Sequence, residues 1–210
     1  EGEGSEAILN NRIAASQGLS LALHNLGRLY YEREQHDLAE PLLRDAIERR
    51  PYYGRARVTL GRLLDDTGRQ VEAVEQFEAA IEHRSDVAAA HHYIGEILAR
   101  QGRLGQAAGH LEESLALSEN RPDTHLELGR LYLNQARIEE AERHLKRALI
   151  MNPDLPAAHE LMGVVNLQRN QRQKAIYHFR RALEFDPDSG TARQYLNRLL
   201  SADPTPPRDA

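Results

Sequence analysis

The sequence predicts an all-α protein, a solenoid built from helix pairs that stack on one another. The prediction comes from a period of about 34 residues that runs through most of the chain. A glycine recurs five times at this spacing, at Gly27, Gly61, Gly95, Gly129 and Gly163. Columns of small residues and of large apolar residues keep the same period. Self-similarity of this length is typical of repeat proteins, in which each unit packs against its neighbours.

The other columns lie in the second half of each repeat. Small residues form two of them, at Ala39, Ala73, Ala107, Ala141 and Ala175 and at Ala46, Ala80, Ser114, Ala148 and Ala182. Between them lie the large apolar residues Leu43, Phe77, Leu111, Leu145 and Phe179. Steps of four and three residues place these columns on one helical face. We therefore expect two antiparallel helices in each repeat, which approach closely where glycine and the small residues lie.

The predicted elements begin with a lone helix at 1–19, which keeps the register of a second helix. Five repeats follow, at 20–53, 54–87, 88–121, 122–155 and 156–189. A short break ends each first helix, and Gly68 and Gly102 suit a left-handed backbone there. Prolines such as Pro51 and Pro153 end the second helix. A capping helix at 190–200, in the register of a first helix, and a Pro-rich tail at 201–210 complete the chain.

This register resembles the tetratricopeptide repeat family over residues 20–189. The resemblance implies a right-handed superhelical solenoid whose first helices line a concave groove, and a groove that binds a segment of a partner protein. Carried onto this sequence, the groove positions include His24, Arg28, Tyr31, Arg55, Arg62, His92, Glu96 and Arg130. Chaperone-binding relatives use a Lys/Asn clamp, but the corresponding positions here include Thr59, Ala89 and Tyr93, so capture of chaperone tails is not expected.

The groove arginines allow two interpretations. Arg28, Arg55 and Arg62 can hold an acidic or aromatic peptide, because a guanidinium group offers bidentate donors and a stacking surface. Alternatively they pair with acidic residues of neighbouring helices, such as Glu32 and Asp65. The sequence favours internal pairing and leaves the first interpretation open.

Composition excludes several classes of function. The 27 Lys and Arg residues are outnumbered by 32 Asp and Glu residues, and the net charge of -5 gives no general attraction to nucleic acid. No stretch approaches the roughly 20 apolar residues of a membrane span, so membrane insertion is not expected. The absence of Cys excludes thiol catalysis and disulfides. We find no Gly-rich phosphate loop and no distinctive carboxylate pair, and predict no catalysis and no cofactor.

Ten histidines raise the question of a metal site. Six of them form two columns, His91, His125 and His159, and His110, His144 and His178. Residues of one column should lie on the order of 10 Å apart, the distance between packed helices. Zinc requires its ligand nitrogens to converge within about 2.1 Å of the ion, so one column cannot share an ion. We therefore expect these histidines to be structural and predict no metal.

Two functional hypotheses follow. The first is a non-enzymatic scaffold that binds another protein in its groove. The second is a self-assembling protein whose terminal half repeats, one before and one after the complete repeats, stack head to tail into a filament or ring. The end residues in this case are Leu9, Ile13, Leu196, Leu199 and Leu200. The sequence leaves the compartment open, since an exported and a cytoplasmic protein are both compatible with it.

Overall fold

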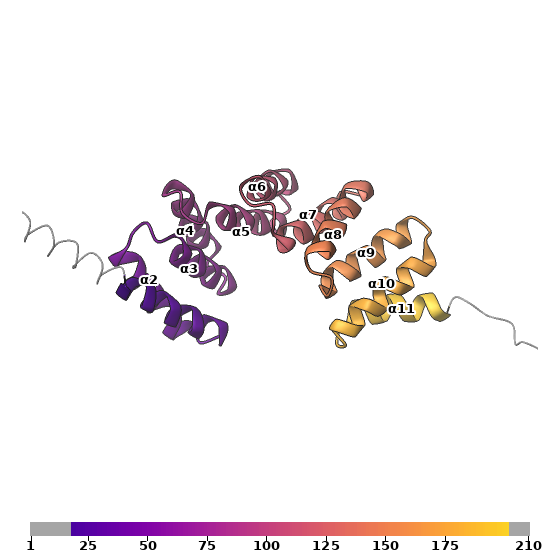
Figure 1. Ribbon diagram of the computed structural model, residues 1–210, viewed down its shortest axis with the longest axis horizontal. Coiled ribbons are helices and arrows are strands. Elements are labelled where there is room, and N and C mark those ends of the chain that lie inside the picture. Colours follow the sequence, from indigo (N-terminus) through magenta and orange to yellow (C-terminus); the bar gives the residue numbers. More distant parts are fainter. Residues whose placement is uncertain (1–17, 202–210) are drawn as a thin grey trace, which may run out of the picture. The chain divides into compact units, whose positions relative to one another are not determined.

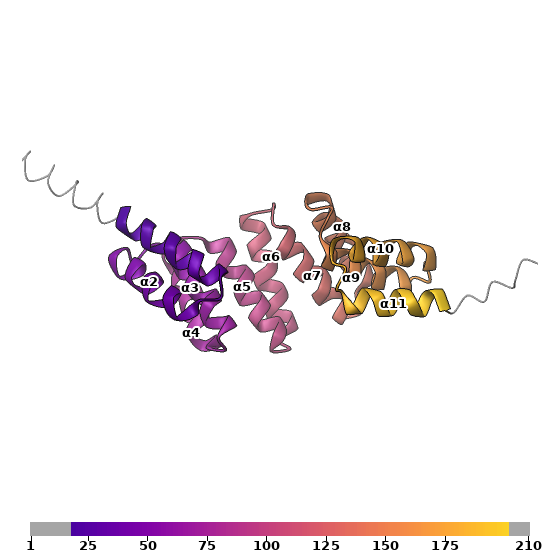
Figure 2. The ribbon, with the colours of Figure 1, turned by 90° about the horizontal axis from the view of Figure 1, so that it is seen from below.

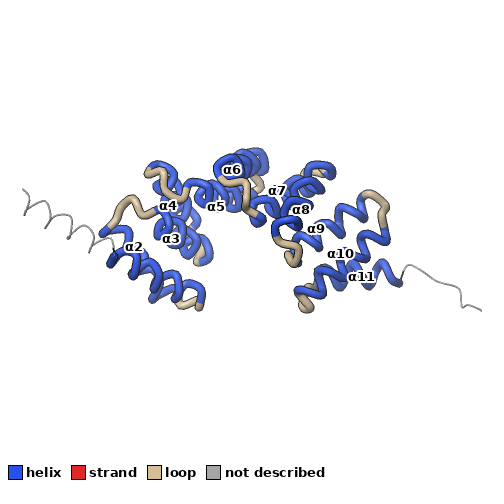
Figure 3. Tube along the Cα trace, viewed as in Figure 1, coloured by secondary structure: helices blue, strands red, loops and turns tan. Residues whose placement is uncertain are grey.

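A computed structural model of the chain describes residues 18–201. These residues form helices joined by short turns, with no strand among them (Figure 3). The prediction of an all-α fold made of helix pairs is confirmed. Leu9 and Ile13 lie outside the described residues, as does most of the predicted tail.

The helices follow the period of the sequence. Residues 18–32 are helical, and the helices after them are α2 (His36–Arg49), α3 (Gly54–Asp66), α4 (Gln70–Glu82), α5 (Val87–Arg100), α6 (Leu104–Leu117), α7 (Pro122–Asn134), α8 (Ile138–Met151), α9 (Pro156–Gln168), α10 (Arg172–Phe185) and α11 (Gly190–Ser201) (Figure 1). The even-numbered helices from α2 to α10 begin at one constant spacing, which equals the spacing of the glycines. They carry the columns of small and large apolar residues, as the sequence predicts.

The chain divides into two compact units, and the boundary falls between Leu117 and Ser118. In the first unit, α3 packs against α4 and α5 packs against α6 (Figure 2). In the second unit, α7 packs against α8 and α9 packs against α10, and α11 packs against α10. Each unit therefore has a core of its own, formed between the two helices of every pair and between successive pairs.

The glycine column lies where the two helices of a pair approach most closely. A Cβ atom built on Gly61 would lie 2.5 Å from the Phe77 ring, and one on Gly129 would lie 2.6 Å from the Leu145 side chain. Real Cβ atoms do not approach other atoms so closely, so a larger residue would push the helices apart. The large apolar column, which faces these glycines, is fully buried.

Left-handed residues end each first helix. Gly68 and Gly102 have φ angles of +81° and +76°, as the sequence predicts. Glu34, Ala136 and Asn170 occupy the equivalent positions with φ angles of 58°, 57° and 56°. This conformation lets the next backbone N–H bond a carbonyl within the helix, as Arg69 N does to Leu64 O at 2.7 Å. The turn between paired helices is thus set by the backbone, and it repeats even where no glycine is present.

The helix α11 packs against the end of the second unit. Ala192 is fully buried in a cluster with Phe179, and Leu196 and Leu199 are partly buried against the same cluster. Leu200 remains about half exposed. Two of the three end residues proposed on α11 are therefore partly used in packing within the chain.

Candidate partner-binding face

The first unit presents a polar and aromatic surface on its first helices. We call it the first-helix face, and it comprises exposed or half-buried side chains from residues 18–32, α3 and α5. Side chains on this surface contact one another from helix to helix. Arg62 of α3 lies between two tyrosine rings, with its guanidinium carbon 5.2 Å from the centroid of Tyr31 and 5.2 Å from that of Tyr93. A cation held over two rings is an ordered, partly exposed group that can still contact a ligand.

Hydrogen bonds fix the surroundings of Arg62. The Tyr31 hydroxyl donates to Asp66 at 2.5 Å, and Arg100 pairs with Asp65. Burial and the hydrogen bond to Asp66 raise the pKa of Tyr31 well above its ordinary value, so its hydroxyl stays protonated and continues to donate. These contacts join three successive first helices through side chains on one surface.

His24 lies beneath this surface, with 5% of its area exposed. The Thr59 hydroxyl donates to the Arg55 carbonyl at 2.9 Å, so it accepts from His24 Nε2 at 3.2 Å. His24 Nδ1 is then the acceptor for the Tyr53 hydroxyl, at 3.0 Å. Burial and the charges of Arg28 and Arg55 lower the pKa of His24, which favours the neutral ring. The hydrogen bonds then set which nitrogen carries the proton. His24 positions the neighbouring helices and offers little area to a partner.

His92 is buried in the same way, two repeats further on. Its Nε2 lies 3.3 Å from a carboxylate oxygen of Glu96. Burial alone would raise the pKa of Glu96, but the hydrogen bond from His92 and the charges of Arg100 and Arg62 hold that pKa below its ordinary value. Glu96 is consequently ionised near neutral pH and half-buried on the first-helix face.

The three groove arginines of the first unit differ in how they are held. Arg28 pairs with Glu32, and both side chains are about half exposed. Arg62 stacks on rings instead of pairing with an acid at salt-bridge distance. Arg55 is exposed and its side chain forms no hydrogen bond or ion pair with any residue in the range 18–201. Internal pairing therefore accounts for Arg28 and leaves Arg55 as an unpaired cation.

A hollow of about 330 Å³ lies beside Arg55. We call it the Arg55 hollow, and its lining is Leu21, Arg50, Tyr52, Tyr53, Arg55, Ser85 and Asp86. Tyr52 is 67% exposed, and the Arg50 guanidinium carbon lies 5.1 Å from the centroid of the Tyr53 ring. Two cations and one carboxylate give the hollow a net positive character, and the exposed Tyr52 ring can stack against a planar side chain.

In the second unit, Arg130 is exposed on α7. Its guanidinium group lies 3.6 Å from Glu127, one turn earlier on the same helix. The Arg130 side chain is about half exposed, and the contact is long for a salt bridge, so the arginine is readily available to another group.

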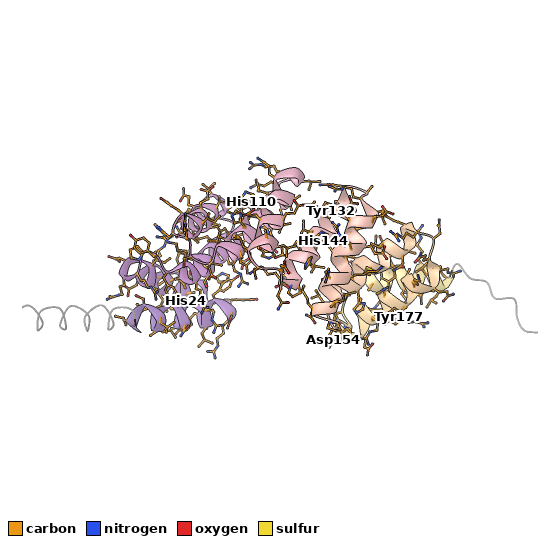
Figure 4. All side chains as sticks on the ribbon, turned by 45° about the horizontal axis from the view of Figure 1, so that its top comes forward. His24, His110, Tyr132, His144, Asp154 and Tyr177 are labelled. Carbon is orange, nitrogen blue, oxygen red and sulfur yellow. The ribbon has the colours of Figure 1, made fainter. Side chains whose placement is uncertain are left out.

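The two histidine columns face each other, which the sequence analysis did not anticipate. The Nδ1 atoms of His91 and His110 are 3.1 Å apart. The corresponding distances are 2.9 Å for His125 and His144 and 3.0 Å for His159 and His178. Figure 4 labels His110 and His144, the members that lie on α6 and α8. The signal for this pairing was the separation of the two histidines along the chain, which is the same in three repeats.

Each histidine pair is a hydrogen bond between the two helices of one repeat. His159 Nε2 donates to the Pro153 carbonyl at 2.9 Å, so in the neutral ring its Nδ1 accepts from His178 Nδ1. Arg57 and Gln76 take these two columns in an earlier repeat. Arg57 donates to the Pro51 carbonyl at 2.9 Å and to Gln76 at 3.1 Å, which is the same pattern of contacts. The histidine pairs thus act as structural links in place of an arginine–glutamine pair.

The described part of the chain contains no group of three or more His, Asp or Glu side chains placed to hold a metal ion. Within each histidine pair, the two facing Nδ1 atoms bond each other instead of converging on a third point. Among residues 18–201, no helix has the length and apolar character needed to cross a membrane.

Stacked helix pairs of this kind define a helical repeat protein. One model of the tetratricopeptide repeat matches residues 24–82 and again 60–122, and a second such model matches residues 98–164. The matches thus extend without a gap from residue 24 to residue 164. The chain belongs to the tetratricopeptide repeat family. No curated protein matches the sequence significantly.

Solved structures of similar fold come from several proteins. One is pilF of Pseudomonas aeruginosa, with 20% sequence identity, a TM-score of 0.73, and coverage of 91% of this chain and 95% of that one. Another is PilW, a type IV pilus biogenesis factor, with 20% identity, a TM-score of 0.71, and coverage of 92% and 90%. A third is YrrB, with 19% identity, a TM-score of 0.61, and coverage of 92% and 97%. At these identities the similarity shows the fold.

The histidine pairs predict that stability depends on pH. Burial lowers the pKa values of His91, His110, His125, His159 and His178 below 6.5, and that of His178 to about 4. As the pH falls below 6.5, the unfolded chain takes up protons before the folded chain does. The free energy of unfolding should therefore be largest above pH 6.5 and decrease between pH 6.5 and about 4.

The arginine–glutamine pair of an earlier repeat suggests a control variant. His159→Arg with His178→Gln reproduces the pair formed by Arg57 and Gln76, which does not titrate in this range. Relative to the wild type, the variant should lose about 1 kcal/mol less stability between pH 7.5 and 4.5, a difference of roughly 2–4 °C in melting temperature. Equal losses in the two proteins, measured by thermal unfolding at both pH values, would show that the pair does not carry the dependence.

Proposed function

We propose that this protein is a non-enzymatic scaffold that binds a segment of a partner protein on the first-helix face of its first unit. Tetratricopeptide repeat proteins bind other proteins or peptides and are in general not catalysts. The observation that carries the proposal is the unpaired, exposed Arg55 beside a hollow with aromatic walls. An exposed cation that the fold does not use for packing is available to a ligand.

The chemistry of this face defines the class of segment. Arg55 would bind a carboxylate of the partner, since a guanidinium group donates two parallel hydrogen bonds to it. Tyr52, which is largely exposed, would hold a neighbouring aromatic or apolar side chain in the Arg55 hollow. Arg62, held between its two tyrosines, would extend the positive surface along α3 toward Arg28. The expected ligand is an acidic segment with an aromatic or large apolar residue.

The second unit would add a weaker contact. Arg130 is exposed on α7, where its pairing with Glu127 is loose. We propose it as a contact for a part of the partner that extends beyond the first unit. Its replacement should weaken binding less than replacement of Arg55, because Glu127 already competes for the Arg130 guanidinium group, whereas Arg55 has no such partner among residues 18–201.

Peptide selection tests the proposal. A phage-displayed library of random peptides is selected on the 210-residue chain, and the affinity of enriched peptides is measured by fluorescence anisotropy. The selected peptides should be acidic and contain an aromatic or large apolar residue. Arg55→Ala should weaken their binding by about tenfold or more, since a hydrogen bond between charged groups contributes roughly 1.5–3 kcal/mol.

The matched control is Arg143→Ala, which removes an exposed arginine from the second helix α8. It should leave the affinity unchanged. Peptides that are basic, or that bind equally well to the Arg55→Ala variant, would contradict the proposed site.

A second candidate function is end-to-end self-assembly. Leu26 and Leu29, at the N-terminal end of the first unit, are 42% and 40% exposed. Their equivalents one repeat later, Leu60 and Leu63, are each 1% exposed, because the preceding helix pair covers them. At the other end, Leu200 is 47% exposed, whereas its equivalent Leu64 is fully buried.

No helix within residues 18–201 covers these columns, and we propose that a second copy of the chain does so. A head-to-tail contact would place the α11 end of one molecule against the start of the next, and such contacts propagate unless they close into a ring. Leu196 and Leu199 would contribute only their exposed parts, because both also pack within the chain. Leu9 and Ile13, which lie outside the described residues, belong to the same proposed end surface.

Light scattering of the purified protein tests assembly. If the ends stack, the mean mass should rise with concentration, and Leu26→Gln with Leu29→Gln should hold it near the monomer value. Ile150→Gln, at a residue of α8 that is 71% exposed, is the control and should assemble like the wild type. A wild-type chain that stays monomeric at high concentration would exclude stable stacking.

A further inference from the structure

A second hollow lies on the second helices of the first unit. It occupies about 550 Å³ between α4 and α6, above α5, and we call it the α4/α6 slot. Its lining is Gln70, Val71, Val74, Glu75, Glu78, Ile94, Ile97, Leu98, Gln101, Arg103, Gln106, Gly109 and His110. This volume lies within the range of about 300–1,000 Å³ found for ligand pockets. None of these residues belongs to the first-helix face.

The corresponding space between α2 and α4 is closed by ion pairs. Arg69 lies 2.9 Å from Glu40, and Arg44 lies 3.5 Å from Glu72. These contacts join side chains of α2 to side chains at the start of α4. In this repeat the charged groups therefore bridge the two second helices.

One repeat later the bridge is lost. Val74 takes the position of Glu40, so Arg103, which takes the position of Arg69, has no carboxylate to reach. Arg103 instead donates to the Gln106 side chain at 2.6 Å. The apolar Val74 side chain now lines the slot, and the two second helices are left without an ion pair across it.

Glycines widen the same space. A Cβ atom built on Gly105 or Gly109 of α6 would meet no atom within 4 Å, in contrast to the crowded glycines of the period column. A glycine within a helix costs about 1 kcal/mol relative to alanine, and packing does not require one at either position. Gly109, which lines the slot, therefore leaves it open at a cost in helix stability, and Gly105 lies one turn earlier on α6.

The slot has an apolar floor, and its two ends carry charged residues of opposite sign. Ile94, Ile97 and Leu98 form the floor, and Val71 lies at the rim, 75% exposed. Arg103 lies where the two second helices begin, and Glu75 and Glu78 lie further along α4. These two glutamates are exposed and form no hydrogen bond or ion pair with other described residues through their side chains.

From this arrangement we infer that the α4/α6 slot binds a peptide segment of a partner protein that presents two neighbouring apolar side chains followed by a lysine or arginine. The apolar side chains lie on the floor between the two helices. The basic side chain reaches Glu75 and Glu78, whose charges are complementary to it and form no ion pair among residues 18–201. This surface goes beyond the first-helix face, and its ligand has the opposite charge.

The test separates the slot from the first-helix face. Phage-displayed random peptides are selected on the wild-type chain while soluble Gly109→Leu protein is present in excess as a competitor. The introduced leucine side chain would fill the slot. Because a Cβ atom at this position meets no other atom and leucine favours the helix over glycine, the variant should fold with an unchanged or higher melting temperature. Peptides that stay bound to the wild-type chain during this competition are those that need the slot to be open.

Surviving peptides should carry the apolar pair with a following Lys or Arg. They should bind at least tenfold more weakly to Gly109→Leu and to Val74→Glu, which restores the acid found at Glu40 for pairing with Arg103. Glu75→Gln with Glu78→Gln should weaken binding severalfold and remove the preference for a basic residue. Arg55→Ala should have no effect, so failure of the first-helix site and failure of the slot are distinguishable.

The inference is overturned if no peptide survives the competition, if the surviving peptides are acidic, or if their affinity is unchanged by the Val74→Glu or the double glutamine substitution.

Discussion

The close contact between a glycine of the first helix and a leucine or phenylalanine of the second is the constraint on which this structure depends. It recurs in all five pairs, from Gly27 against Leu43 to Gly163 against Phe179, where a Cβ atom would lie 2.9 Å and 2.6 Å from the facing side chain. Because the glycine adds no bulk, the large side chain fills the space between the helices and is fully buried. Close packing of this kind tolerates little change in volume.

Since the interior is constrained in this way, its columns change only between similar residues, such as Leu and Phe, and the larger differences between repeats lie at the outer positions. The column that holds Arg57 in one repeat holds His91 in the next, and both reach a partner on the second helix. The Glu40 position becomes Val74, which opens a slot without disturbing the neighbouring core residues. The same helix pair can thus present different chemistry at each step, which is the physical basis for proposing two binding surfaces on one unit.

The fold was predictable from the sequence because its determinants are local and periodic. The glycine, the small residues and the large apolar residue of each repeat all lie within one helix pair, so their register alone identifies the pair. The left-handed turns were predictable at Gly68 and Gly102. Asn170 is of a type that adopts this conformation readily, whereas at Glu34 and Ala136 the residue type gave no such signal.

The binding face was only partly predictable. The arginines were identified by register, but their state depends on contacts between repeats. Arg62 stacks on Tyr31 and Tyr93, which belong to the preceding and the following repeat, whereas Arg55 is left unpaired. The Arg55 hollow combines residues of two inter-repeat turns with Leu21 and Arg55 from two helices, and the slot arises from side chains that are small or missing. The pattern of residue types along the sequence does not show where the folded chain leaves a hollow.

One comparison tests most directly the claim that interior positions do not tolerate added volume, whereas outer positions do. Gly95→Ala and Gly109→Ala make the same substitution in the two helices of one pair. A Cβ on Gly95 would lie 2.7 Å from Leu111, whereas one on Gly109 meets nothing within 4 Å. Measured by chemical denaturation, Gly95→Ala should lower the free energy of unfolding by about 1–3 kcal/mol, and Gly109→Ala should raise it by up to about 1 kcal/mol. Equal effects of the two substitutions would contradict the account.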